Sequence, residues 1–236
     1  MEAKERIIVA LDVPSRQEAL GLVERLSGEV GVFKIGLQLF TAQGPEMVRE
    51  VIERGGEVFL DLKLYDIPNT VASAALEAAK LGARMVTLHA GGGRAMMSAA
   101  VERVAAWSGE TGRPKPLLLG VTVLTSMDET TLHAAGVARS LREQVLELAR
   151  QTEGQKMGGI VCSPKEIRLL RGAGVRLPLI TPGIRPAGES THDQARVMTP
   201  LKALQAGADY LVIGRPIIRA EDPVQAARDI AASMKE

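Results

Sequence analysis

Two ionisable side chains, Asp61 and Lys63, stand at the end of an apolar run that begins at Val58. Because successive side chains of a strand point to opposite faces, Asp61 and Lys63 share one face and the leucines around them share the other. The leucines can then pack against helices while the carboxylate and the ammonium group share a confined interior. Burying such a pair is costly unless it is well compensated, which favours a functional role, although a purely structural salt bridge also fits this pattern.

Further ionisable residues follow other apolar runs. Asp12 and Lys34 lie at the first two runs, Asp66 lies in the loop after Lys63, and His89 ends the fourth run. Lysines that compete for carboxylate oxygens disfavour a divalent metal ion, so we expect a site without metal. A lysine among carboxylates stays protonated, which suits an acid or an electrostatic partner better than a Schiff base.

Glycine and arginine follow the last two apolar runs, as Gly183 with Arg185 and Gly214 with Arg215. Glycine lets backbone amides approach an anion, and the arginine fork can place two donors on it. These residues predict a phosphate site, although simple turns between strand and helix would also use them. The polar loop over residues 183–196 could close over a bound phosphate as a lid.

Eight short β-rich runs alternate with segments of helical period. The strands are expected at residues 7–11, 32–35, 58–62, 85–88, 117–123, 160–162, 177–180 and 210–213. The helices are expected at residues 15–26, 45–54, 71–81, 95–107, 141–150, 165–170, 199–206 and 223–234. The first helix opens with Ser15 and Glu18, a Ser-x-x-Glu capping box.

This alternation predicts an α/β fold, a closed (β/α)₈ TIM barrel that forms a single domain over residues 1–236. A doubly wound open sheet is the alternative. That fold normally carries a Gly-x-Gly-x-x-Gly turn after the first strand, where this chain reads Asp12-Val13-Pro14-Ser15. In a barrel the reacting groups lie at the carboxyl ends of the strands, and phosphate is held after strands seven and eight.

The composition narrows the class of ligand. The 29 lysines and arginines nearly balance 28 aspartates and glutamates, and the net charge of +1 gives no field that would attract nucleic acid or an anionic membrane. The apolar runs have the length of strands, and the charged N-terminus precedes no signal-like apolar block. We expect a cytoplasmic protein with a small-molecule ligand. The single cysteine, Cys162, is expected to be a buried strand residue.

Short motifs spread over the whole chain resemble the bacterial orotidine 5′-phosphate decarboxylases. The matching pieces are Ala10-Leu11-Asp12, Phe33-Lys34-Ile35-Gly36, residues 59–68, His89-Ala90-Gly91-Gly92, Leu124-Thr125-Ser126, Val161-Cys162-Ser163, residues 181–185, Asp193-Gln194 and Gly214-Arg215. In this order the pieces are highly specific. The resemblance implies decarboxylation of orotidine 5′-monophosphate at C6 to give UMP, the closing step of pyrimidine nucleotide synthesis, without a cofactor.

The resemblance also implies residue roles in the reaction. Lys63 would donate the proton to C6, and Asp61 would lie against the departing carboxylate. Asp66, with Ile67 and Thr70, would reach the active site of the partner subunit in a homodimer.

The remaining substrate contacts are implied in the same way. Asp12 and Lys34, the latter also part of the catalytic charge network, would hold the ribose hydroxyls. Thr125 and Ser126 would meet the pyrimidine, and which of them makes the base contact is left open. Gln194, Gly214, Arg215 and the nearby Arg185 would hold the phosphate.

Two other functions fit parts of the pattern. A metal-dependent sugar-phosphate decarboxylase, aldolase or epimerase on a related barrel can carry a similar Asp-x-Lys-x-x-Asp strand end, but the pieces at Thr125-Ser126 and Asp193-Gln194 disfavour it. A non-catalytic nucleotide-binding barrel would be expected to have lost Asp61 or Lys63, and both are present.

Overall fold

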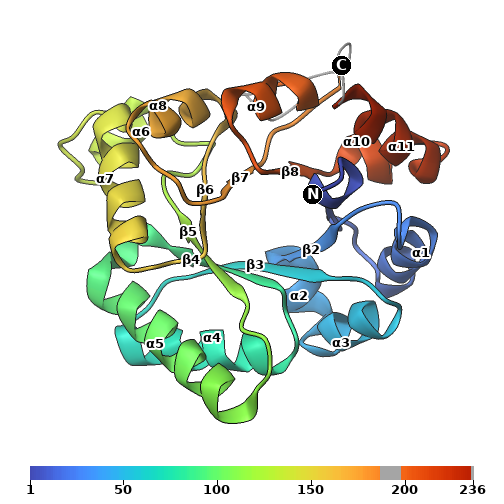
Figure 1. Ribbon diagram of the computed structural model, residues 1–236, viewed down its shortest axis with the longest axis horizontal. Coiled ribbons are helices and arrows are strands. Elements are labelled where there is room, and N and C mark those ends of the chain that lie inside the picture. Colours follow the sequence, from blue (N-terminus) through green and yellow to red (C-terminus); the bar gives the residue numbers. More distant parts are fainter. Residues whose placement is uncertain (187–197, 235–236) are drawn as a thin grey trace.

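The strands of the chain close into a parallel barrel. The computed structural model describes residues 1–186 and 198–234. Within them, β1 to β8 pair in chain order, and β8 pairs with β1 to complete the ring (Figure 1). The predicted (β/α)₈ barrel is confirmed, and the alternative of an open doubly wound sheet is wrong.

The element bounds show strands and helices in alternation. The strands are β1 Ile7–Ala10, β2 Val32–Gly36, β3 Val58–Leu64, β4 Met85–His89, β5 Leu117–Val121, β6 Gly159–Val161, β7 Leu179–Thr181 and β8 Tyr210–Ile213. The helices are α1 Arg16–Leu26, α2 Leu37–Gln43, α3 Glu46–Glu53, α4 Pro68–Lys80, α5 Gly93–Thr111, α6 Glu129–Ala134, α7 Leu141–Gly154, α8 Ile167–Gly172, α9 Pro200–Ala206, α10 Arg215–Ile218 and α11 Pro223–Ser233.

Several predicted strand ends are wrong by one or two residues. β3 continues to Leu64, and β5 stops at Val121. β7 begins at Leu179, two residues later than predicted, because Pro178 has no N–H to donate to a neighbouring strand. The carbonyl of Pro178 still accepts a hydrogen bond from Ile160 N at 2.8 Å.

The helix starts follow from their first residues. Ser15 caps α1, because its hydroxyl oxygen accepts from the backbone N of Glu18 at 3.2 Å. Among the hydrogen bonds of the described residues, this is the one bond of the predicted capping box that is present. α4 begins at Pro68, three residues before the prediction, because proline suits the first turn of a helix. Within the described part of the chain, no helix has the length and apolar character needed to cross a lipid bilayer.

Three short helices, α2, α6 and α10, were not predicted. Each follows a strand directly or within its βα loop, and none exceeds seven residues. Each is the first of two helices that follow one strand, and the predicted alternation of one helix per strand had no place for it. They belong to the loops that surround the mouth of the barrel.

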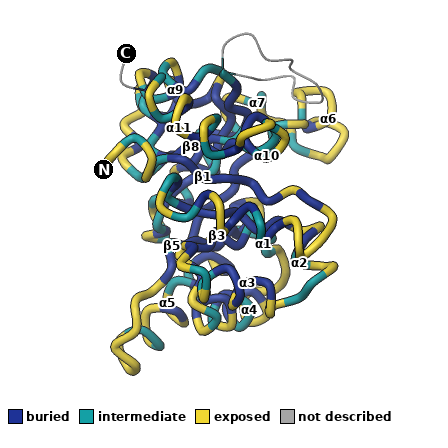
Figure 2. Tube along the Cα trace, turned by 90° about the vertical axis from the view of Figure 1, so that its right-hand side faces the viewer, coloured by how far each residue is buried: buried dark blue, intermediate teal, exposed yellow. Residues whose placement is uncertain are grey.

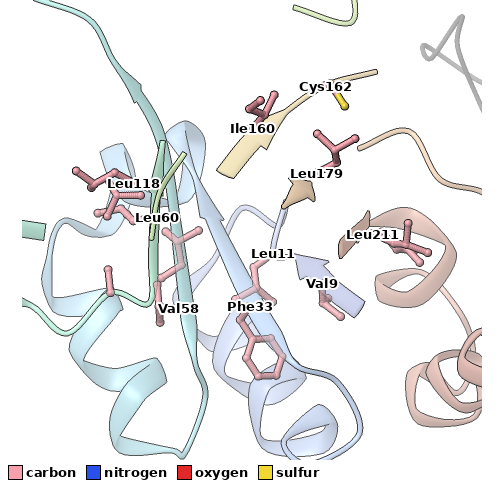
Figure 3. Packing of buried hydrophobic residues seen from close by; sticks show 14 of the residues in the cluster. Val9, Leu11, Phe33, Val58, Leu60, Leu118, Ile160, Cys162, Leu179 and Leu211 are labelled. Carbon is pink, nitrogen blue, oxygen red and sulfur yellow. The ribbon is translucent and has the colours of Figure 1, made fainter. Parts of the chain in front are cut away.

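The core has two layers that reflect the alternation along each strand. The inner layer fills the barrel and consists of Ile8, Ala10, Val32, Phe59, Met85, Leu119, Ile180, Tyr210 and Val212. The outer layer packs between strands and helices, and Figure 3 shows members of it such as Val9, Phe33 and Leu60. The buried part of the trace follows the strands and the exposed part lies on the surrounding helices and loops (Figure 2).

The inner layer determines where the polar residues of the mouth lie. Lys34, Asp61 and Thr87 each come two residues after a member of that layer, on three neighbouring strands. Residues two apart in a strand point to the same face. The barrel therefore turns these three side chains inward, directly above its apolar filling.

Candidate active site

A cavity of about 460 Å³ opens at the carboxyl ends of the strands. Eight residues to which the resemblance assigned a catalytic or substrate-binding role line it: Asp12, Lys34, Asp61, Lys63, Thr125, Arg185, Gly214 and Arg215. They come from both halves of the chain, and only closure of the barrel brings them together. A cavity with convergent polar groups at this end of a barrel is the expected position of an active site.

Asp61 and Lys63 form an ion pair inside this cavity. Lys63 Nζ donates to Asp61 Oδ1 and Oδ2, each at 2.9 Å. The Asp61 side chain is 14% exposed and that of Lys63 is 33% exposed, so the ammonium group remains accessible from the cavity while its partner is largely covered. The pair predicted from the sequence is therefore present.

The backbone brings the two side chains together by a route that simple alternation did not predict. Lys63 has φ 51°, in the left-handed region that residues other than glycine rarely adopt. The register between β3 and β4 shifts between Leu60 and Leu64, around this residue. A non-glycine residue in this conformation costs of order 1–3 kcal/mol, and such outliers gather at functional sites.

Thr87 on β4 contacts both ends of this irregular segment. Its hydroxyl accepts from the backbone N of Lys63 at 2.9 Å and donates to Asp61 Oδ1 at 2.9 Å. The residue is fully buried. Sequence reasoning missed Thr87, although a polar residue two positions after the inward-facing Met85 was a usable signal.

Lys34 extends the charge network across the barrel. Its Nζ lies 3.2 Å from Asp12 Oδ1 and 3.8 Å from Asp61 Oδ2. Gly36 leaves room for this arrangement, because a Cβ at that position would lie 3.0 Å from Lys34 Nζ. Carboxylates and ammonium groups therefore alternate from Asp12 to Lys63, which compensates each buried charge.

The other side of the cavity is cationic. Arg185 and Arg215 line it, and Arg185 is only 6% exposed. Gly183, with φ 81°, makes the turn after β7, and Gly214 lies directly before α10. Arg219, which sequence reasoning did not single out, also lines the cavity. This side has the donors that a phosphate dianion requires.

Comparison with known proteins places the chain in a family. The family model described as "Orotidine 5'-phosphate decarboxylase / HUMPS family" matches residues 5–230. This chain belongs to that family.

Individual members of the family match the chain along nearly its whole length. A protein of Syntrophotalea carbinolica named orotidine 5'-phosphate decarboxylase is 52% identical over 235 residues, 99% of this chain and 96% of the relative. One of the same name from Moorella thermoacetica is 52% identical over 237 residues, 100% of this chain and 94% of the relative. The crystal structure of orotidine 5'-phosphate decarboxylase from Lactobacillus acidophilus has a TM-score of 0.86 at 34% identity, covering 98% of this chain and 99% of that one.

The segment after β3 lies apart from the charge network. Asp66, Ile67 and Thr70 are all exposed. Asp66 Oδ1 accepts from Ile67 N at 2.6 Å, and none of the hydrogen bonds or ion pairs within the described residues joins Asp66 to Asp61 or Lys63. Within the described residues, Asp66 therefore does not join the charge network of its own barrel.

Two other predicted contacts have different positions relative to the cavity. Thr125 lines the cavity, whereas Ser126 is exposed on the following loop. This favours Thr125 for the base contact that the sequence left open. Gln194 and the central part of the predicted lid lie outside the residues that the structure describes.

His89, at the end of β4, lies close enough to Lys63 for the ammonium charge to act on its imidazole. Its Nδ1 accepts from Gly91 N at 3.1 Å, and its ring lies 5.6 Å from that of Tyr65 between centroids. Burial, and to a lesser degree the charge of Lys63, lowers the pKa of His89 below its ordinary value. Both effects favour the neutral imidazole, in which Nδ1 is free to accept.

In the described ranges 1–186 and 198–234, no group of three or more His, Cys, Asp or Glu side chains is arranged to hold a metal ion. The prediction of a metal-free reaction stays a prediction. Cys162 is buried as predicted, just after β6, and burial raises the pKa of its thiol well above the ordinary value. An inert thiol of this kind is structural.

Proposed function

We propose that the protein converts orotidine 5′-monophosphate to UMP and CO₂ in pyrimidine nucleotide synthesis, without a cofactor. The observation that carries the proposal is the Asp61–Lys63 pair at the mouth of the barrel, opposite a cationic wall, in a chain half identical to proteins named for this reaction. A cytoplasmic location is part of the proposal, and a single cysteine is compatible with a reducing compartment.

Lys63 is the proposed proton donor. Loss of CO₂ turns a carboxylate into a carbanion at C6, so negative charge moves toward that carbon during the reaction. An ammonium group fixed beside C6 interacts more strongly with the transition state than with the substrate, which is the requirement for catalysis. The same ammonium then donates a proton to C6. Its 33% exposure toward the cavity is consistent with this role.

Asp61 holds the Lys63 ammonium and would lie against the substrate carboxylate. Repulsion between the two carboxylates would be relieved when CO₂ departs, in addition to the orienting role of Asp61. Two lysines near Asp61 compensate its charge in the absence of substrate.

The contacts to the ribose and to the phosphate are assigned from the charge and the position of the residues. Asp12 and Lys34 are proposed for the ribose hydroxyls, because they are paired at 3.2 Å and lie between the reacting pair and the cationic wall. Arg185, Gly214 and Arg215 are proposed for the phosphate. Binding energy from the phosphate, far from C6, can then hold the base in the reactive orientation.

Contacts to the base and one more to the phosphate complete the proposed nucleotide site. Thr125, with Ser126 nearby, is proposed for the base. Gln194 is retained as a phosphate ligand on the basis of the sequence alone.

The protein is further proposed to be a homodimer with shared active sites. Tyr65 is 66% exposed and Ile67 is 67% exposed, and both belong to an exposed segment, residues 65–70, that directly follows the catalytic strand. Large apolar side chains that project from one segment are typical of an interaction surface. If a second copy covers this segment, Asp66, Ile67 and Thr70 can reach the partner's cavity.

The test is turnover of orotidine 5′-monophosphate by the purified protein. We expect the ultraviolet absorbance of the substrate to fall, with UMP and CO₂ formed in equal amounts. Binding of UMP without turnover would support a nucleotide-binding barrel instead. Turnover of a sugar phosphate that requires Mg²⁺ would support the metal-dependent alternative.

A further inference from the structure

We infer that Thr87 is a positioning residue whose hydroxyl sets the geometry of the Asp61–Lys63 pair. The inference rests on the proposed role of Lys63 as proton donor. Thr87 does not line the cavity, and its hydroxyl bonds to the Asp61 carboxylate and to the Lys63 backbone N, which hold the Lys63 ammonium group in place. Thr87 therefore aligns Lys63, the proposed proton donor, and does not itself donate a proton to the substrate.

The directions of both Thr87 hydrogen bonds follow from the chemistry of the groups. The backbone N–H of Lys63 can only donate, so it occupies a lone pair of Thr87 Oγ1 at 2.9 Å. The hydroxyl has one proton, and it lies 2.9 Å from Asp61 Oδ1, which as a carboxylate oxygen can only accept. One hydroxyl thus links the main chain of Lys63 to the side chain of Asp61.

This link lies where the backbone most needs a partner. Lys63 has φ 51°, and the register of β3 against β4 shifts around it, so the residue is outside the regular ladder. A buried backbone N–H without a partner is costly. Thr87 provides that partner from the neighbouring strand, and the fully buried threonine leaves the hydroxyl no competing contact with bulk water.

The carboxylate is oriented by the same hydroxyl. Asp61 Oδ1 accepts from Thr87 Oγ1 at 2.9 Å while both Asp61 oxygens accept from Lys63 Nζ, so the Thr87 hydroxyl fixes the plane in which the carboxylate holds the ammonium group. Thr87 is β-branched and lies on a strand, which restricts its χ1 and keeps the hydroxyl in one position. Without the hydroxyl, Asp61 and the Lys63 backbone would each lose one restraint. A displacement of about 1 Å in a reacting group can cost about 10²-fold in rate.

The experiment compares a variant of Thr87 that loses the hydroxyl with one that keeps it. In Thr87→Val the shape is kept and the hydroxyl is lost, and we expect kcat to fall by about 30- to 100-fold. The KM for orotidine 5′-monophosphate and the Kd for UMP should stay within about threefold, because no ligand contact is removed. Thr87→Ser keeps the hydroxyl and should recover kcat to within about fivefold of wild type.

A matched control measures the cost of losing any buried hydroxyl. Thr152 is also fully buried, and its Oγ1 donates to Leu148 O at 2.8 Å within α7, away from the cavity. Thr152→Val should leave kcat and KM unchanged. Should Thr87→Val not fold, Thr87→Cys takes its place, and the weak thiol donor should lower kcat by at least about tenfold with KM unchanged.

Three results would overturn the inference. They are wild-type kcat in Thr87→Val, a loss of UMP affinity as large as the loss of kcat, and a Thr87→Ser protein as slow as Thr87→Val. Lys63→Ala in the same assay separates this inference from the proposed function. If Lys63→Ala is inactive while Thr87→Val is fully active, only the role of Thr87 is wrong, whereas an active Lys63→Ala protein contradicts the proposed mechanism.

Discussion

The Nζ atom of Lys34 lies 3.8 Å from Asp61 Oδ2, an oxygen that also accepts from Lys63 Nζ at 2.9 Å. The two residues belong to neighbouring strands, β2 and β3, whose pairing sets Gly36 opposite Asp61. Asp61 therefore keeps an ammonium group nearby even when one lysine is removed. This makes single lysine variants informative, because the carboxylate is not left unpaired in the cavity.

The first prediction concerns Lys63→Ala. We expect kcat to fall by at least about 10⁴-fold, because proton donation and electrostatic stabilisation are both lost. UMP should still bind, since Lys34 continues to compensate Asp61. Absorbance assays give kcat and calorimetry gives the affinity for UMP. Lys80→Ala, which removes an exposed lysine of α4, is the control and should be fully active. Near-wild-type turnover of Lys63→Ala would remove that residue from the mechanism.

Exhaustive chelation is expected to leave the activity unchanged. Lys34 and Lys63 already occupy oxygens of Asp12 and Asp61 that a divalent metal ion would need. The measurement is kcat before and after dialysis against EDTA. Activity that disappears with EDTA and returns with Mg²⁺ or Zn²⁺ would favour the sugar-phosphate alternative.

Arg215→Ala should lower kcat/KM for the nucleotide. A charged, bidentate contact is worth roughly 1.5–3 kcal/mol, which corresponds to a loss of about 10- to 150-fold. Arg215→Lys keeps the charge but not the planar guanidinium, and its kcat/KM should lie between those of the wild type and Arg215→Ala. Phosphite added with orotidine should not rescue Arg215→Ala fully. Equal losses on orotidine 5′-monophosphate and on orotidine without its phosphate would place Arg215 away from the phosphate.

The shared active site is tested by subunit exchange. Lys63→Ala and Asp66→Ala homodimers should each be nearly inactive. In a mixed dimer one site carries both defects, and the other has an intact Lys63 and an intact Asp66. With random exchange, half the dimers are mixed and half of their sites work, so the two-fold symmetric dimer predicts about a quarter of the wild-type rate. An inactive mixture, with exchange verified by mass spectrometry, would show that both residues serve the same chain's site.

His89 is expected to make stability depend on pH. Its folded-state pKa is lowered by burial and by Lys63, so the unfolded chain, with a histidine pKa near 6.5, binds the proton first as the pH falls. The stabilisation is present above about pH 7 and is lost as the pH falls through the lowered pKa. Urea unfolding between pH 7 and pH 5 should show a smaller loss in His89→Asn, which cannot titrate. An unchanged pH slope in that variant would exclude His89 as the source.

The sequence alone determined the type of fold and the charged residues of the site. Alternating strand and helix periods led to the barrel, because a parallel barrel requires that order of elements. Asp61 and Lys63 were found because charge at the end of an apolar strand is unusual and local in the sequence. The burial of Cys162 was predicted in the same way, from the apolar residue Val161 before it. One helix per strand was found, with its start correct to within a few residues, while α2, α6 and α10 are extra helices that the alternation of one strand and one helix does not predict.

Only the tertiary structure decided how these residues meet. Lys63, in its left-handed conformation, donates its backbone N–H to Thr87, a residue 24 positions away that comes into reach only when β3 and β4 pair. The 3.8 Å approach of Lys34 to Asp61 likewise depends on the register of β2 against β3. Hydrophobic periodicity is a property of one segment, whereas these contacts are set by the packing of several strands around a common interior.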